Sequence, residues 1–304
     1  ISPIIQCGLK PVFVDIELDT YNMDPDEIKN AISDQTGLIM VVHSLGCPAK
    51  MHEIMEIANN SNIPVFEDCC EAHGASINGK KVGSFGLLSA WSFFVAHNMT
   101  TGEGGMITTS DKDVEKMLRS LREFGRYFDV NPNQPRYHYN DEFLKNYDER
   151  YVFDNIGYNV RMTDIAASLG IEQLKKLDFF NDKRVENAQY YTSQLSSFEN
   201  LILPKEIDNY YHSYYGYTVL VNENNTFTRL ELVRHLEERN VETRAFMGGN
   251  LTLQPAYRGE NFDVRSDLKN TNFILNHSFF IGSHPFIGED EREQVISAFS
   301  SFFN

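Results

Sequence analysis

The first half of the chain alternates short apolar runs with stretches of helical periodicity, and this rhythm limits the folds that it can adopt. Strands of a mostly parallel sheet that is covered by helices typically give this pattern. The apolar runs lie at 12–16, 38–42, 63–66 and 87–94, and the helical stretches lie at 25–33 and 51–60. We therefore expect an α/β domain whose sheet is covered by helices.

Another helical pattern lies near 112–123, still in the first half. A polar stretch rich in Asn and Tyr follows at 127–150, and we interpret it as a loop near a site or an interface. Further helical spacing, including a helix expected over 183–197, then leads into a compact α+β region. We expect these helices to link a large domain at 1–182 to a smaller C-terminal domain at 183–304.

Charge and cysteine content limit which binding partners and which cellular compartment we expect for this chain. The chain has 27 Lys and Arg against 43 Asp and Glu residues, a net charge of −16, which argues against binding to nucleic acid or anionic lipid. No apolar run approaches the ~20 residues that span a bilayer, so we expect no membrane segment. The 4 cysteines favour a reducing, cytoplasmic location over a disulfide framework.

Two segments of the first half carry polar groups suited to chemistry. Residues 65–75 read V-F-E-D-C-C-E-A-H-G-A, an apolar strand that ends in acidic residues, where Asp68 alone would most simply be a turn residue. Residues 91–109 read W-S-F-F-V-A-H-N-M-T-T-G-E-G-G-M-I-T-T, which joins a strand, a hydroxyl, a histidine and a glycine turn. Glycines in that turn can take positive φ and let the backbone approach a ligand. Each segment is a weak signal alone, and their combination is specific.

Together the two segments resemble the DegT/DnrJ/StrS family of sugar aminotransferases and dehydratases, which are fold-type I pyridoxal phosphate enzymes. The resemblance covers nearly the whole chain, including P-V-F-V-D-I at 11–16, T-Y-N-M-D-P at 20–25 and G-Y-N-V-R-M-T-D-I-A-A at 157–167. It implies an aspartate aminotransferase-like fold, in which the large domain has a mostly parallel mixed sheet, and a homodimer with active sites between subunits. In the family a Gly/Ser/Thr turn for the cofactor phosphate precedes these segments. Because no such turn precedes Ile1, we expect the N-terminal part of the large domain to be missing from this sequence.

The resemblance also implies roles in binding pyridoxal 5′-phosphate or pyridoxamine 5′-phosphate. Asp68 would pair with the pyridine nitrogen and keep the ring protonated as an electron sink. Glu71 takes the position where the family usually has Gln at the ring hydroxyl, and Ser92 matches a serine that contacts the phosphate. Asn159 matches a residue that reaches the phosphate from the neighbouring subunit. No metal ligand is implied.

Position 97 departs from the aminotransferases of the family. They read S-F-x-x-x-K-N, whereas residues 92–98 here read S-F-F-V-A-H-N, so His97 stands in place of the Schiff-base lysine. An imidazole cannot form that covalent bond, and we expect the cofactor to be held non-covalently. Free histidine has a pKa of about 6.5, so His97 can take and return a proton at neutral pH. A lone histidine is usually structural, but this motif position favours catalysis.

The lysine-to-histidine change resembles the family's 3-dehydratases, which act on CDP- or GDP-linked 4-keto-6-deoxyhexoses. The stretch G-N-L-T-L-Q-P at 249–255 resembles the same branch. Arg244 and Asn250 are candidates for contacting the sugar nucleotide, although ordinary surface polarity explains them equally well. The CDP-sugar type has a cysteine cluster for an iron–sulfur centre after the glycine turn, whereas 125–130 here has no cysteine. We therefore expect no iron–sulfur cluster, and glutamate as the amino donor.

These features predict a pyridoxal phosphate-dependent sugar dehydratase of deoxysugar and O-antigen biosynthesis, with His97 as acid and base. A sugar aminotransferase is one alternative, and it would need another lysine in the pocket. The nearest, Lys80 and Lys81, lie in a polar turn that reads I-N-G-K-K-V-G. A non-catalytic binding protein could share the scaffold, although Asp68, Ser92 and the glycine turn argue against loss of activity. The sequence leaves the nucleotide and the sugar open.

Overall fold

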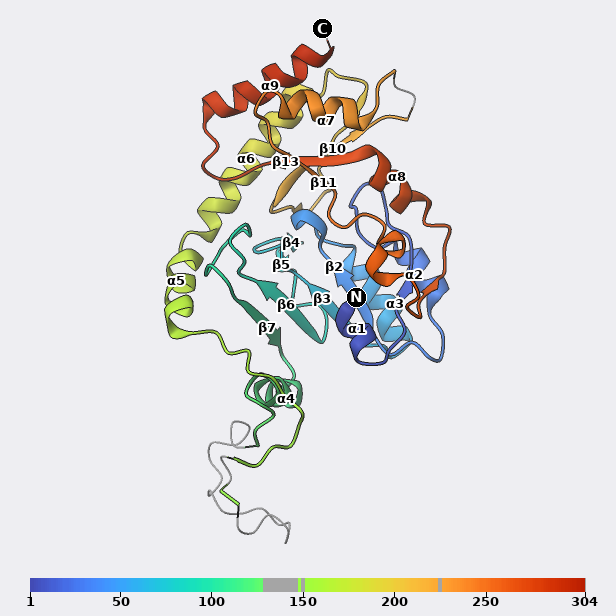
Figure 1. Cartoon of the computed structure of the whole chain (residues 1–304), viewed down its shortest axis with the longest axis vertical. Coiled ribbons are helices and arrows are strands. Elements are labelled where there is room, and N and C mark those ends of the chain that lie inside the picture. Colours follow the sequence, from blue (N-terminus) through green and yellow to red (C-terminus); the bar gives the residue numbers. More distant parts are fainter. Residues whose placement is uncertain (128–146, 149–150, 224–225, 304) are drawn as a thin grey trace.

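The computed structural model describes residues 1–127, 147–148, 151–223 and 226–303, so most of the loop expected at 127–150 lies outside the described residues. Two main sheets, each with its own helices and hydrophobic core, form the body of the chain (Figure 1). One sheet belongs to the first half of the sequence and the other to the second half. This is the predicted combination of a larger α/β unit and a smaller α+β unit.

The sheet of the first half has the strand order β2-β3-β6-β7. β2, β3 and β6 are parallel and β7 is antiparallel to β6, which confirms the predicted mixed, mostly parallel sheet. Met51, Ile54 and Ala58 follow helical spacing on α3 and are buried in the core of this half. The bounds are β2 Ile39–Val42, β3 Val65–Asp68, β6 Leu88–Ser92, β7 Gly105–Thr109, α2 Pro25–Ala31 and α3 Met51–Asn60.

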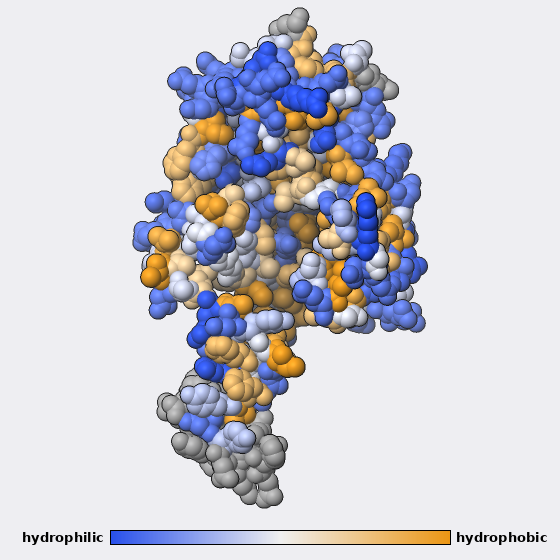
Figure 2. Space-filling model, viewed as in Figure 1, coloured by the Kyte–Doolittle hydropathy of each residue, from blue (hydrophilic) through white to orange (hydrophobic). Residues whose placement is uncertain are grey.

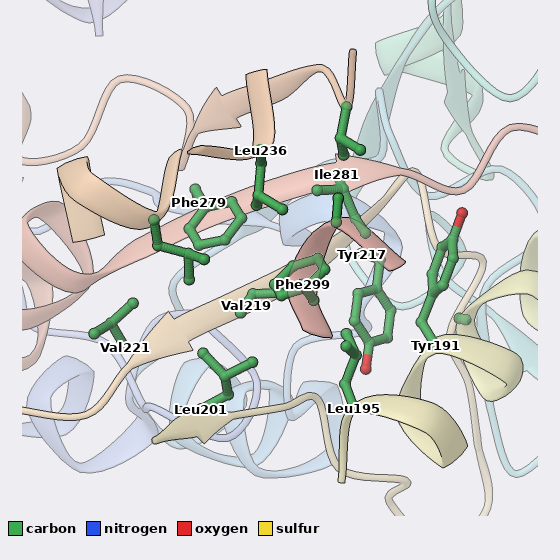
Figure 3. Close-up of a cluster of buried hydrophobic side chains, with 14 of the residues drawn as sticks. Tyr191, Leu195, Leu201, Tyr217, Val219, Val221, Leu236, Phe279, Ile281 and Phe299 are labelled. Atoms are coloured by element: carbon green, nitrogen blue, oxygen red, sulfur yellow. The ribbon is translucent and has the colours of Figure 1, made fainter. Parts of the chain in front are cut away.

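The sheet of the second half is antiparallel, in the order β11-β13-β10-β8. Figure 3 shows its core, where Tyr217 and Val219 of β10 and Phe279 of β13 meet Tyr191 and Phe299 from two helices. Every residue of β10 is buried, as is typical of a strand that is covered on both faces. The bounds are β8 Leu201–Ile202, β10 Gly216–Val221, β11 Thr243–Ala245, β13 Ser278–Gly282, α6 Leu177–Leu195, α7 Arg229–Glu237 and α9 Glu289–Phe303.

Short elements join the two halves. β1 (Val12–Phe13) pairs in parallel with β12 (Asp263–Val264), and β9 of the second half pairs with β4 of the first. The strand expected at 12–16 is only two residues long, because Asp15 instead binds the first turn of α8 through Asn270 and Thr271. The other bounds are α1 Ser2–Gln6, β4 Ser76–Ile77, β5 Lys80–Lys81, β9 Tyr210–Tyr211, α8 Lys269–His277, η1 Ser44–Gly46, η5 Leu251–Leu253 and η6 Pro255–Tyr257.

Helix α6 carries the chain from the first half to the second along one side of the molecule (Figure 1). It begins at Leu177 rather than at residue 183, so the boundary expected after residue 182 falls inside a continuous helix. The division into 1–182 and 183–304 stays a prediction. In the part of the chain that the structure describes, neither α6 nor any other helix is long and apolar enough to cross a membrane.

Two helices lie at the edge of the body, α4 (Lys112–Arg122) and α5 (Asp164–Leu174). α5 buries none of its residues, and Ile165, Leu169 and Leu174 are 80%, 53% and 61% exposed. Figure 2 shows hydrophobic side chains on the flank where α5 lies. An apolar surface of this kind is typical of a contact with another chain.

Candidate active site

A cavity of about 440 Å³ lies between the carboxyl ends of β2 and β3 and segments of the second half. Asp68, Glu71 and His97, three residues singled out in the sequence, all line it. Loops converge at the carboxyl ends of parallel strands, and ligands of open α/β sheets bind there. Most of the other walls are apolar, and they include Tyr21, Val42, Phe246, Met247, Leu251 and Ile274.

Asp68 is the last residue of β3, and the turn after this strand positions its side chain. Its Oδ1 accepts the backbone N–H of Cys70 at 3.1 Å. The side chain is half-buried and lines the cavity beside Cys70 and Glu71. The site therefore has a carboxylate at a strand end, where it can pair with a positively charged N–H group of a ligand.

Glu71 follows three residues later, and only 8% of it is exposed. One carboxyl oxygen, Oε2, accepts the backbone N–H of Leu45 at 3.0 Å. Burial raises the pKa of this carboxyl to about 7; the Leu45 N–H opposes the rise and the charge of Asp68 adds to it. Near neutral pH a large share of Glu71 is therefore a neutral acid.

His97 lies in the loop after β6, and the backbone that precedes it fixes its ring. Its Nδ1 is 3.2 Å from the carbonyl oxygen of Ser92. A carbonyl only accepts, so Nδ1 carries the proton of the neutral ring and Nε2 keeps a free lone pair. Burial lowers the pKa of His97; the Ser92 carbonyl and Asp68 oppose the fall and Arg184 adds to it. The ring is thus neutral at pH 7 and can accept a proton.

Ser92 and Asn159 are not among the residues that line this cavity. Ser92 ends β6, and its Oγ accepts the N–H of Phe94 at 3.3 Å. Asn159 is exposed, forms a backbone bridge with Glu123, and accepts the Arg161 guanidinium at 2.9 and 3.2 Å. A residue placed like this is available to a neighbouring chain, and both predicted phosphate contacts stay predictions.

Arg244 and Asn250 are also absent from the cavity lining. Arg244 is exposed on β11 and forms an ion pair with Glu242. Asn250 is 4% exposed, and both polar atoms of its side chain are bonded: Oδ1 accepts the Thr252 N–H at 3.0 Å, and Nδ2 donates to Asn272 at 2.8 Å. It begins the turn η5, whose neighbours line the cavity. Direct contact of either residue with substrate stays a prediction.

Two buried asparagines hold the loop of His97, and sequence reasoning missed one of them, Asn181. Asn98 Nδ2 donates to Asn181 Oδ1 at 3.0 Å and to the Ser213 carbonyl at 3.3 Å. Asn181 Nδ2 in turn donates to the His73 carbonyl at 2.7 Å. The motif S-F-x-x-x-K-N pointed to Asn98, which is adjacent to His97, but nothing local in the sequence pointed to Asn181 on α6.

Tyr215 and Arg184 are two further residues that sequence reasoning missed. The Tyr215 ring packs against the His97 ring at 5.5 Å between centroids. Arg184, 3% exposed, donates to the carbonyls of Tyr214 and Tyr215 at 3.4 and 3.1 Å. Burial lowers the pKa of Arg184 to about 10, so it stays a cation at pH 7. The segment that carries Tyr215 is therefore anchored to α6.

Lys80 and Lys81, the lysines that an aminotransferase would need, lie on β5 and are exposed. The Lys80 ammonium group is 4.1 Å from the centroid of the Phe85 ring, and Lys81 donates to the Gly74 carbonyl at 2.7 Å. Neither lines the cavity. These two side chains therefore do not stand in for the lysine that His97 replaces.

A buried network supports the strand ends beneath the cavity. His43 Nδ1 accepts the Ala49 N–H at 3.0 Å, and His43 Nε2 donates to Glu67 at 3.1 Å. Burial would raise the pKa of Glu67, but the bonds from His43 and from the backbone outweigh it, and the pKa is lowered. The other donors to Glu67 are the N–H groups of Gly83, Phe85 and Gly86, at 2.7, 2.8 and 2.7 Å.

Comparison with known proteins gives matches along the whole chain. Residues 1–300 match the DegT/DnrJ/EryC1/StrS aminotransferase family. The chain is 36% identical over 308 residues to the dTDP-4-dehydro-2,6-dideoxy-D-glucose 3-dehydratase of Saccharopolyspora spinosa, covering 99% of this chain and 67% of the relative.

Solved structures of two kinds of enzyme share the fold. The E. coli GDP-4-keto-6-deoxy-D-mannose-3-dehydratase with bound hydrated PLP matches with a TM-score of 0.87 and 30% identity, covering 98% of this chain and 76% of that one. A GDP-4-keto-6-deoxymannose-3-dehydratase with a trapped PLP–glutamate geminal diamine matches with the same TM-score, 0.87. An aminotransferase from Psychrobacter cryohalolentis matches with a TM-score of 0.91 and 31% identity, covering 100% and 78%. The fold alone therefore does not choose between dehydration and amino transfer.

Proposed function

Because this chain belongs to the DegT/DnrJ/EryC1/StrS aminotransferase family and is an enzyme that depends on pyridoxal 5′-phosphate, we propose that it is a nucleotide-sugar 3-dehydratase. The proposed substrate is a nucleotide-linked 4-keto-6-deoxyhexose of polysaccharide biosynthesis, and the product is the 3-deoxy sugar. The observation that carries this proposal is His97 on the cavity wall, at the motif position where aminotransferases of the family have lysine.

The residues of the cavity fit this cofactor. Its volume, about 440 Å³, is within the range of small-molecule sites, about 300–1,000 Å³, and most of its walls are apolar. Asp68 would pair with the ring nitrogen, and Glu71 would face the ring hydroxyl. Ser92, and Asn159 of a neighbouring subunit, would hold the phosphate. When bound, the cofactor supplies an electron sink for the carbon attached to its ring.

His97 would move the proton that the reaction requires. Its Nδ1 is occupied by the Ser92 carbonyl at 3.2 Å, so Nε2 is the atom that accepts. A neutral imidazole at pH 7 is a competent base, and Nε2 would take the proton from the carbon attached to the cofactor ring. Asn98 and Tyr215 limit the movement of His97, which keeps Nε2 directed at one position.

Glutamate is the proposed amino donor that restores the cofactor after each turnover. The PLP–glutamate adduct trapped in a similar dehydratase supports this proposal. We propose a reaction without an iron–sulfur cluster, because 125–130 contains no cysteine and the four cysteines are free and lie elsewhere in the chain. Cofactor and glutamate would then suffice.

We further propose that the enzyme acts as a homodimer in the cytoplasm. The exposed apolar face of α5 provides a surface that a second copy can cover. Asn159 is exposed, which a residue needs if it is to reach the active site of a neighbouring subunit. Arg244 and Asn250 stay candidates for the sugar-nucleotide side of the pocket. Because Asn250 is bonded to Thr252 and Asn272, it would influence substrate binding indirectly, by holding the turn η5 in place.

An aminotransferase is the second candidate, and the similarity to the Psychrobacter cryohalolentis enzyme favours it. The exposed positions of Lys80 and Lys81 argue against it. A non-catalytic binding protein is a weaker alternative, because Asp68, Glu71 and a neutral His97 all line one cavity.

The proposal is tested by incubating the protein with pyridoxamine phosphate, glutamate and a panel of 4-keto-6-deoxy sugar nucleotides. A dehydratase releases ammonia and forms a 3-deoxy sugar, whereas an aminotransferase forms an amino sugar without ammonia. His97→Lys should abolish dehydration and give a covalently attached cofactor, seen as an absorbance band that borohydride makes irreversible. A covalent band of this kind in the unmodified protein would show that the interpretation of His97 is wrong.

A further inference from the structure

Glu71 and His97 line the same cavity, but their surroundings suit one to release a proton and the other to accept one. His97 has a free lone pair at Nε2, because Nδ1 donates to the Ser92 carbonyl. Glu71 is 8% exposed, and its one hydrogen-bond partner in the described part of the chain is the Leu45 N–H. Sites that separate two titratable groups in this way usually divide acid and base work between them.

The surroundings of Glu71 favour the protonated carboxyl. Asp68 faces it from the end of β3, Cys70 from the turn between them, and Tyr215 from the segment before β10. None of these groups is a cation, and Asp68 is a carboxylate whose charge opposes a second one nearby. The Leu45 N–H binds Oε2 only, so Oε1 is left without a partner among the described residues while the side chain lines the cavity.

We propose that Glu71 is a second catalytic residue of the dehydration, the acid that gives its proton to the departing C3 oxygen while His97 serves as the base. This inference rests on the proposed function and goes beyond it, because binding of the cofactor requires only a hydrogen bond from this position. A hydroxide ion is a poor leaving group, and a positioned acid lets it depart as water.

The step balances in protons and electrons. Nε2 of His97 would take one proton from the carbon attached to the cofactor ring, and the electron pair of the broken C–H bond would move toward the sugar. The C3–O bond breaks with its electron pair on oxygen, and the Glu71 proton converts this oxygen to water. The site is left with a His97 imidazolium and a Glu71 carboxylate, and one proton transfer between them restores both. No oxidant or reductant is consumed.

Glu71→Gln separates this role from a role in binding alone. Glutamine keeps the size and can still donate a hydrogen bond, but it has no proton to release. The variant should bind pyridoxamine phosphate, measured by absorbance titration, within about twofold of the unmodified protein. It should also keep its reaction with glutamate, in which no sugar C3–O bond is broken. Its dehydration kcat should fall by roughly 100-fold or more. Glu56→Gln, on the exposed side of α3, is the matched control and should leave all three unchanged.

A second measurement does not depend on turnover. With carboxyl-labelled glutamate, carbon NMR of the protein should show one glutamate that titrates near pH 7 and disappears in Glu71→Gln, as expected from its pKa of about 7. Glutamates that all titrate below about pH 5.5 would overturn the inference, as would a Glu71→Gln variant with full dehydration activity. If the unmodified protein dehydrates no sugar of the panel, both the proposed function and this inference are wrong. If the unmodified protein and Glu71→Gln dehydrate the sugar equally well, only this inference is wrong.

Discussion

Replacing Asp15 would test whether the contact between the first segment and α8 supports both the fold and the cavity. Asp15 is 6% exposed and accepts three bonds: the N–H groups of Asn270 and Thr271, both at 2.8 Å, and the Thr271 hydroxyl at 2.7 Å. Both N–H groups belong to the first turn of α8, whose N-cap residue Leu268 forms no side-chain hydrogen bond to the helix. Asp267 accepts the N–H of Lys269 at 3.0 Å, and Asp15 accepts the next two. Asp15 therefore caps a helix that lies more than 250 positions later in the sequence.

The expected magnitude follows from these bonds. A hydrogen bond to a charged group contributes about 1.5–3 kcal/mol, and loss of a helix cap costs about 1 kcal/mol. Since the three bonds share one carboxylate and water can reach part of the turn after its removal, Asp15→Ala should lower the free energy of unfolding by about 3 kcal/mol. Asp15→Asn should cost about half as much, because one amide oxygen still accepts while the NH₂ group faces a donor.

The contribution of Asp15 to the free energy of unfolding should fall at low pH. Burial would raise the pKa of Asp15, but the bonds from Thr271 and Asn270 outweigh it, and the folded pKa is lowered. A lowered folded pKa means that the stabilisation is complete above the unfolded pKa, about 3.9, and is lost as pH falls through the folded value. The difference in urea midpoint between the unmodified protein and Asp15→Ala should therefore be constant from about pH 5 upward and should shrink below pH 4.

Urea unfolding can be followed by circular dichroism for both halves and by the fluorescence of the only tryptophan, Trp91, for the first half. Asp19→Asn is the matched control, because Asp19 is exposed and its one ion pair among the described residues is with Lys205. Such pairs contribute about 0–1 kcal/mol. If Asp15→Ala shifts the midpoint no more than this control does, the cap contributes nothing and the reasoning is refuted. Ile16 and Thr271 also line the cavity, so Asp15→Ala should weaken cofactor binding as well.

Two further predictions concern the base of the site and the outer surface. Glu67 accepts four bonds, and Glu67→Gln leaves only one acceptor oxygen in its place. The free energy of unfolding, measured in urea, should therefore fall by about 3 kcal/mol. A fall of less than about 1 kcal/mol would contradict the role given to this network. Ile165→Glu places a charge on the face of α5 that we propose a second copy covers, and should reduce the sedimentation coefficient without changing circular dichroism. An unchanged sedimentation coefficient would exclude α5 from the subunit interface.

Local periodicity was sufficient to predict the longer elements of the fold. α3 spans Met51–Asn60 as expected, because its apolar residues recur at helical spacing and face the core. α8, in contrast, has only one buried residue, Ile274, and two N–H groups of its first turn are bound by the distant Asp15. The two-residue pairs such as β1 with β12 depend equally on contacts between distant parts of the chain. No window of neighbouring residues contains either signal.

The same limit applies to the candidate site. A motif on one strand end and the loop after another predicted Asp68, Glu71 and His97, and parallel pairing of the strands brings them to one edge. Asn181 and Arg184 could not be found in this way, because their function depends on where α6 packs. Polar residues in the middle of a helix most often face solvent, and only the structure shows these two to be buried.

The spacing of Asn181 and Arg184 sets a constraint on length. They are three residues apart, so they lie on one face of α6, about 4.5 Å apart along its axis. The first is bonded to the loop of His97 through Asn98, and the second is bonded to the carbonyl of Tyr215, whose ring packs against the His97 ring. One inserted residue between them would rotate the second by about 100° away from its partner. Substitutions around the cavity can alter its chemistry one group at a time, whereas an insertion or deletion in this turn would release both supports of His97 at once.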